Sequence, residues 1–123
     1  MRNIADMTAV ELSECLCKMA DPAENLFSDV AVRNAIDDFK KSMPEKATWK
    51  QALSVFAAVL YPVLCGEAHR TDVYAILAAI DGVSVADIEG RNGLEVMGNM
   101  FKVFVQDGDV QDLFRPVCEA RSK

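Results

Sequence analysis

The stretch ALSVFAAVLYPVLC, Ala52 to Cys65, decides the fold class of this chain. It carries no charged residue and no sustained alternation of apolar and polar residues, so it predicts a buried helix rather than a strand. A helix that is apolar nearly all round should lie at the centre of its domain or give one side to a partner. Pro62 should kink this helix or end its regular part, because its ring clashes with the carbonyl group of Ala58.

Start signals for further helices lie on both sides of this stretch. Thr8 with Glu11, and Thr48 with Gln51, have the spacing of capping boxes. Asp21-Pro22 predicts the end of the first helix and a short second helix through Leu26 and Phe27. Ser28 is then expected to cap a third helix, whose apolar residues recur at helical spacing: Val32, Ala35, Ile36, Phe39 and Met43.

The second half of the chain continues the helical pattern. Val73, Ile76, Leu77 and Ile80 form an apolar stripe, and Gly82 stands where a left-handed C-cap is expected. Ser84 and Asp87 predict the start of a short helix, and Asp109 is expected to cap the last one. The prediction is an all-α fold: one compact domain over residues 1–123, a bundle of about six to eight short helices around an apolar central helix.

Composition and charge narrow the classes of function. The 123 residues have a formal net charge of −6, which argues against binding to nucleic acid through a basic face. The apolar stretch 52–65 is shorter than the roughly 18 to 20 residues that span a bilayer, so no membrane association is expected. The N-terminal stretch lacks the apolar core of a signal peptide, and a cytoplasmic location is expected.

Neither cofactor nor metal site is predicted. Cys15, Cys17, Cys65 and Cys118 show no CxxC pairing and no histidine at ligand spacing, so they are interpreted as reduced structural thiols. A cluster at Asp107, Asp109 and Asp112 suggests calcium, but it lacks the spacing and the terminal glutamate of an EF-hand loop. A turn followed by an N-cap is the favoured interpretation.

The only histidine, His69, stands three residues before Asp72. Residues three apart share a helix face, so the aspartate could orient the imidazole as a general base. No motif of a known catalytic class accompanies the pair. The charged entry to an ordinary helix is therefore favoured over a catalytic site.

Apolar residues on two segments are candidates for partner binding. Methionine suits surfaces that accept several apolar partners, so a stripe of methionine and phenylalanine could form a groove for another helix. Core packing is the alternative explanation of such a stripe. The predicted partner-binding residues are Phe56, Leu60, Met97, Met100, Phe101 and Phe104.

The C-terminal half resembles the small tail assembly chaperones of long-tailed phages and prophages. The family pattern is a charged helix entry of HRED type, a D-V-[YF]-x-I-L-A core, a Gly or Asn turn, a V-x-x-I segment, an asparagine and an acidic last helix with an L-x-x-F-F type end. The resemblance is strongest over residues 69–118, with Thr71 in place of the usual acid and Arg115 in place of a second aromatic residue. The matching residues are His69, Arg70, Asp72, Val73, Tyr74, Ile76, Leu77, Ala78, Gly82, Val85, Ile88, Asn92, Asp109, Leu113 and Phe114.

The resemblance implies a role without catalysis. A protein of this family keeps the long helical tape measure protein soluble while the tail tube assembles around it. The implied partners are the tape measure protein, the tail tube protein and a frameshifted longer version of the chain, and self-association is a further option. A small helical adaptor that binds a folded partner through an apolar groove is the alternative, and an enzyme that uses His69 and Asp72 is the third hypothesis.

Overall fold

The computed structural model describes residues 4–106, which form helices with no strand among them. The α-helices are α1 (Ala9–Phe27), α2 (Val30–Ser42), α3 (Trp49–Val55), α4 (Tyr61–Leu64), α5 (Arg70–Asp81), α6 (Val85–Glu89) and α7 (Gly93–Phe101). A 3-10 turn, Ile4–Asp6, precedes α1, and π-helical turns, Phe56–Leu60 and Lys102–Gln106, follow α3 and α7. The all-α prediction is confirmed over these residues.

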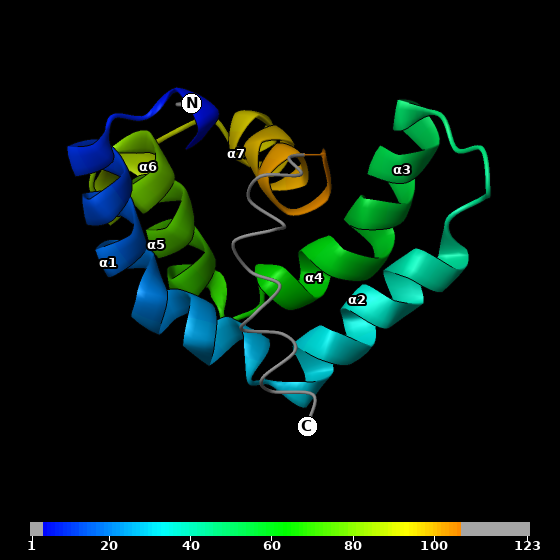
Figure 1. Cartoon of the computed structure of the whole chain (residues 1–123). Coiled ribbons are helices and arrows are strands. Elements are labelled where there is room, and N and C mark those ends of the chain that lie inside the picture. The colour runs from blue at the N-terminus through cyan, green and yellow to red at the C-terminus, as the bar shows by residue number, and fades with distance from the viewer. Residues whose placement is uncertain (1–3, 107–123) are drawn as a thin grey trace.

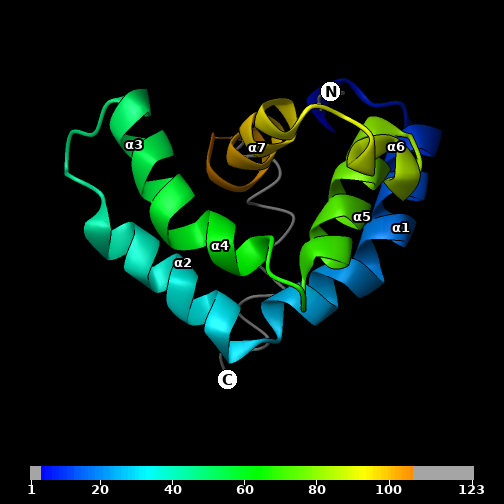
Figure 2. The same ribbon diagram turned by 180° about the vertical axis from the view of Figure 1, so that it is seen from behind.

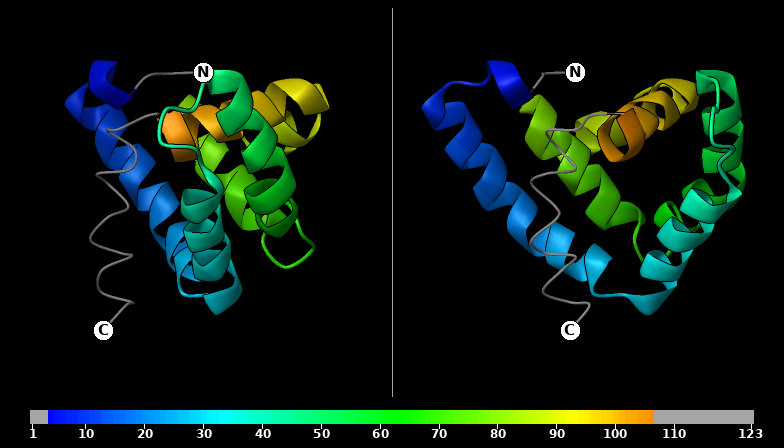
Figure 3. Two further views of the ribbon diagram at one scale, coloured as in Figure 1. Left: turned by 90° about the vertical axis from the view of Figure 1, so that its right-hand side faces the viewer. Right: turned by 45° about the vertical axis from the view of Figure 1, so that its right-hand side comes forward.

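The helices form two arms that meet at one end, here called the apex (Figure 1). One arm consists of α1, α5 and α6, and the other consists of α2, α3 and α4. The chain passes between the arms at the apex twice, from α1 to α2 and from α4 to α5 (Figures 1 and 2). Helix α7 lies between the arms at the opposite, open end, as the side views also show (Figure 3).

Helix α1 runs through Pro22 without a break, so the predicted helix end at Asp21-Pro22 is wrong. A proline inside a helix loses one hydrogen bond and costs about 3 kcal/mol or more. The buried face of α1 continues past it, however, through Met19, Ala23 and Leu26, and α1 packs along the length of α5. Burial against α5 therefore outweighs the local effect of the proline.

The start of α2 also differs from the prediction. Asp29, rather than Ser28, is the N-cap, and its side chain accepts a hydrogen bond of 2.8 Å from the backbone N–H of Ala31. Ser28 instead ends α1, with its hydroxyl group donating to the carbonyl group of Asn25. Both residues are good caps, so the sequence pattern does not distinguish them.

Residues 49–64 form one helical rod in which π-helical turns separate α3 from α4. The regular α-helix ends before Pro62, as predicted, and the backbone N–H of Tyr61 bonds to the carbonyl group of Phe56. Every fourth side chain is buried: Ala52, Phe56, Leu60 and Leu64. In a pure α-helix such a row would drift by about 40° around the axis at each step, and the wider π turns oppose that drift.

The central helix of the fold is α5 rather than the segment 52–65. Helix α5 is buried nearly all round, whereas the rod 49–64 buries one row and leaves its other sides half-buried or exposed. The buried residues of α5 are Val73, Ile76, Leu77, Ala78, Ala79 and Ile80. Gly82 ends it with a φ of 74°, a left-handed conformation that glycine adopts without a steric penalty, as predicted.

Phe56 lies at the centre of an aromatic cluster that links three elements. Its ring contacts Phe39 of α2 at 6.5 Å, Tyr61 of α4 at 6.3 Å and Phe101 of α7 at 5.6 Å, measured between ring centroids. All three pairs have the edge-to-face geometry that aromatic rings prefer.

We predict that Phe56→Ala lowers the free energy of unfolding by about 3 to 5 kcal/mol, because it removes a fully buried ring from this cluster. Urea denaturation followed by circular dichroism measures the change. Ser54→Ala, an exposed position on the same rod, is the control and should change stability by about 0.5 kcal/mol at most. Equal losses of stability in the two variants would show that the aromatic cluster does not stabilise the rod 49–64.

Candidate functional site

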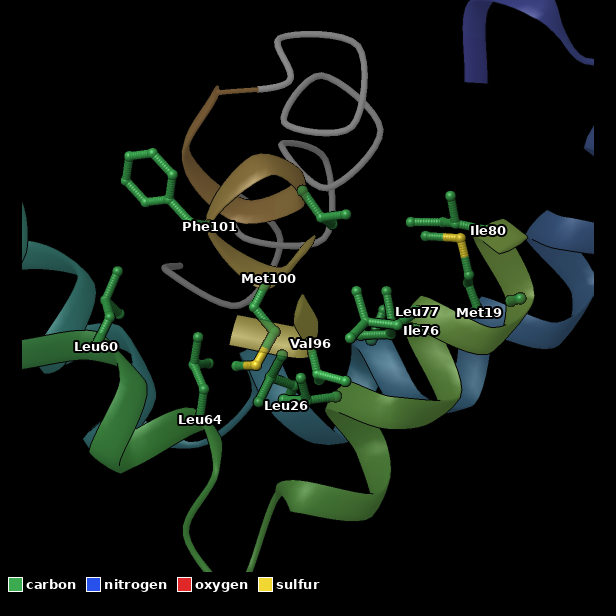
Figure 4. Packing of buried hydrophobic residues seen from close by; sticks show 14 of the residues in the cluster. Met19, Leu26, Leu60, Leu64, Ile76, Leu77, Ile80, Val96, Met100 and Phe101 are labelled. Atoms are coloured by element: carbon green, nitrogen blue, oxygen red, sulfur yellow. The ribbon is translucent and has the colours of Figure 1, made fainter. Parts of the chain in front are cut away.

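Four of the six predicted partner-binding residues face the interior of the protein. Phe56, Leu60, Met100 and Phe101 are buried in the hydrophobic core, so core packing describes them in this conformation. Figure 4 shows Met100 pointing from α7 into the space between the arms, toward Leu64 of α4 and Leu26 of α1. Met97 and Phe104 are half-buried at the edge of the same core and remain accessible.

The surface of the rod 49–64 is free of charge over a long stretch. Residues 51–66 include no Asp, Glu, Lys or Arg, in a chain whose net charge is −6. Ser54, Ala58 and Pro62 are exposed at intervals of four residues, and we call them the uncharged face. Half-buried apolar side chains flank them: Leu53, Val55, Val59, Tyr61 and Val63.

His69 lies at the apex and is only 9% exposed. Its Nε2 contacts a carboxylate oxygen of Asp29 at 2.5 Å, and its Nδ1 lies 3.5 Å from a carboxylate oxygen of Asp72. A carboxylate only accepts hydrogen bonds, so in this contact the Nε2–H group of His69 donates to Asp29. Both ring nitrogens of His69 thus face carboxylates.

The contact between His69 and Asp29 joins two parts of the chain that are 40 residues apart. Asp29 is at the junction of α1 and α2, and His69 directly precedes α5. The predicted proximity of His69 and Asp72 is confirmed, but the closer partner, Asp29, gave no signal in the sequence. The arrangement links the two arms and supports a structural role for the histidine.

Hydrogen bonding to His69 lowers the pKa of Asp29 below its ordinary value of 3.8, and the backbone N–H of Ala31 acts in the same direction. A carboxyl group whose pKa is lowered by folding stabilises the fold above its unfolded pKa. This contribution is lost as the pH falls through the lowered, folded-state pKa. The contact between Asp29 and His69 should therefore contribute less to the stability of the fold in acid.

We predict that Asp29→Asn lowers stability at pH 7 and that the difference from the wild type is smaller at pH 3. Asparagine caps a helix as well as aspartate does, so the substitution removes the charge opposite His69 while it retains the cap. Urea denaturation at both pH values measures the difference, and Asp37→Asn, on an exposed part of α2, is the matched control. A difference that persists unchanged at pH 3 would show that the charge of Asp29 is not what stabilises the apex.

Cys65 follows α4 and packs beneath α7, with its sulfur 3.5 Å from the sulfur of Met100. Burial raises the pKa of the Cys65 thiol, and burial also raises the pKa of its neighbours Tyr61 and Tyr74. A thiol with a raised pKa is mostly protonated near neutral pH and is a poor nucleophile. The structure therefore supports a packing role for this cysteine.

The other cysteines and the acidic cluster complete the predicted sites. Cys15 is buried, with its sulfur 3.3 Å from the sulfur of Met19. Cys17 is exposed, and Cys118 lies outside the described residues. Asp107, Asp109 and Asp112 also lie outside them. Within residues 4–106, no group of three or more His, Cys, Asp or Glu side chains is arranged to hold a metal ion.

No helix between Ile4 and Gln106 is both long enough and apolar enough to cross a membrane. Comparisons with protein-family models, with curated proteins and with solved structures found no match.

Proposed function

We propose that this chain is a tail assembly chaperone of a long-tailed phage or prophage. It would bind the tape measure protein without catalysis in the bacterial cytoplasm and keep it soluble while the tail tube assembles. The resemblance of residues 69–118 suggests the client and the further partners, which are the tube protein, a frameshifted longer version of the chain and a second copy of it. The observation that carries the proposal is the uncharged face of the rod 49–64.

The uncharged face has the properties that a chaperone for apolar helices needs. It offers small exposed side chains, Ser54, Ala58 and Pro62, between half-buried apolar neighbours, so another helix can approach closely. The rest of the chain carries the acidic charge, which favours solubility of a complex. Apolar side chains of the client would thus be covered while the outer surface of the complex stays charged.

We predict that a long helical tape measure protein, encoded directly downstream of this chain, becomes soluble when the two are co-expressed. The two proteins should co-elute in size-exclusion chromatography. If the long protein stays insoluble beside folded chaperone, or is soluble without it, the proposed function is wrong and an adaptor for a folded partner becomes the better hypothesis.

We also predict that Ala58→Glu reduces the amount of soluble client by about tenfold, because it places a charge in an apolar contact where it must lose water. Ala20→Glu, an exposed alanine on α1, is the matched control and should leave the yield unchanged. Thermal unfolding of both variants checks that the fold is intact. Equal loss of yield in the two would place the client-binding surface elsewhere.

A further inference from the structure

Helix α7 is attached to both arms mainly by its side chains. Phe101 packs against Phe56 on one side, and Met100 contacts Cys65, the residue that follows α4. The buried residues of α7 itself are Val96, Met100 and Phe101, at the spacing i, i+4 and i+5, and Val103 in the following turn is buried as well. These side chains fill the space between the arms, toward residues that we call the α7-binding surface: Leu26, Phe56, Leu64 and Cys65 (Figure 4).

The backbone of α7 is less closely packed than that of the other long helices. Helix α1 packs along α5, whereas α7 continues directly into the turn Lys102–Gln106 and packs closely along no other helix of residues 4–106. Gly98 lies in the middle of α7, and a Cβ atom added there would meet no atom within 4 Å. Packing therefore does not require this glycine, which makes α7 a weaker helix than alanine would.

The chain before α7 is held by contacts that do not involve α7. Arg91, two residues before α7, forms a salt bridge with Asp81 at the end of α5. His69 and Asp29 link the arms at the apex, away from α7. Neither contact involves α7, so both can persist when α7 leaves its place.

We propose that the α7-binding surface is a site for a partner helix, which α7 occupies in the free protein and leaves when the partner binds. The partner is an amphipathic helix that presents apolar side chains the size of valine, methionine and phenylalanine at i, i+4 and i+5. Helix α7 itself presents this pattern of side chains. The inference rests on the contacts of α7 and does not require the proposed client.

A labelled peptide of residues 90–106 tests the site directly, because it copies the occupant. Its binding to the full-length protein is measured by fluorescence anisotropy. We predict that Met100→Ala in the protein tightens peptide binding by about tenfold or more, because the resident helix then competes less well. Gly98→Ala in the protein should weaken binding by about two- to fivefold, because it stabilises the resident helix.

A cross-link between α7 and the α7-binding surface provides the control for peptide binding. Met100→Cys places a thiol opposite Cys65, and a short thiol-bridging reagent then holds α7 in place. Cys17→Ser and Cys118→Ser in the same protein keep the reaction at the chosen pair. The same variant before and after bridging is compared, so any loss of stability from the substitutions affects both samples equally. Binding should be present before bridging and absent after it.

Two results would overturn the inference. One is peptide binding that survives the bridge, or that is equally strong for a peptide carrying Met100→Ser and Phe101→Ser. The other is absence of binding to the wild type, to Gly98→Ala and to the unbridged variant while circular dichroism shows all three to be folded. Neither experiment contains the tape measure protein, so the inference and the proposed function can fail separately.

Discussion

The contact between the buried His69 and the half-buried Asp29 is the constraint on which the arrangement of the two arms depends. The chain changes arms twice at the apex, and this contact joins the two crossings. Asp29 also caps α2, so one carboxylate sets both the start of a helix and the position of the neighbouring arm. Because the contact lies at the closed end, it leaves the open end to be filled by α7. A histidine with a nearby acid resembles a catalytic pair in the sequence, yet here both ring nitrogens serve the fold.

Local signals predicted the features that depend on residues close together in the chain. The capping boxes at Thr8 and Thr48 both form, with side-chain and backbone hydrogen bonds between 2.9 and 3.2 Å. Ser84 starts α6 in the same way, and Gly82 ends α5 in the left-handed conformation. Pro62 limits the regular helix before it. In each case the physical cause is contained within about one helical turn, so the sequence pattern is sufficient.

Features that depend on distant neighbours could not be predicted in this way. Pro22 is tolerated inside α1 because α5 packs against that helix, and no pattern near Pro22 in the sequence predicts that contact. Apolar composition suggested the segment 52–65 as the central helix, but the burial of a helix depends on how many of its sides other helices cover. Neighbours cover α5 nearly all round and the rod 49–64 mainly along one row. The same reasoning applies to the predicted partner-binding residues. Met100 and Phe101 are buried, whereas Met97 and Phe104 are half-buried at the edge of the core.

A helix-binding protein must present apolar surface to its partner without exposing it to water beforehand. Large apolar patches lead to aggregation, and a surface that is always open would bind second copies or unrelated chains. An internal helix that fills the site removes this difficulty at the cost of affinity, because a partner must first compete with it. The weak internal helix keeps that cost small, which gives Gly98 a physical reason to be present where packing does not need it. The uncharged face of the rod, whose exposed side chains are small, can then provide the first contact while α7 still covers the larger apolar side chains.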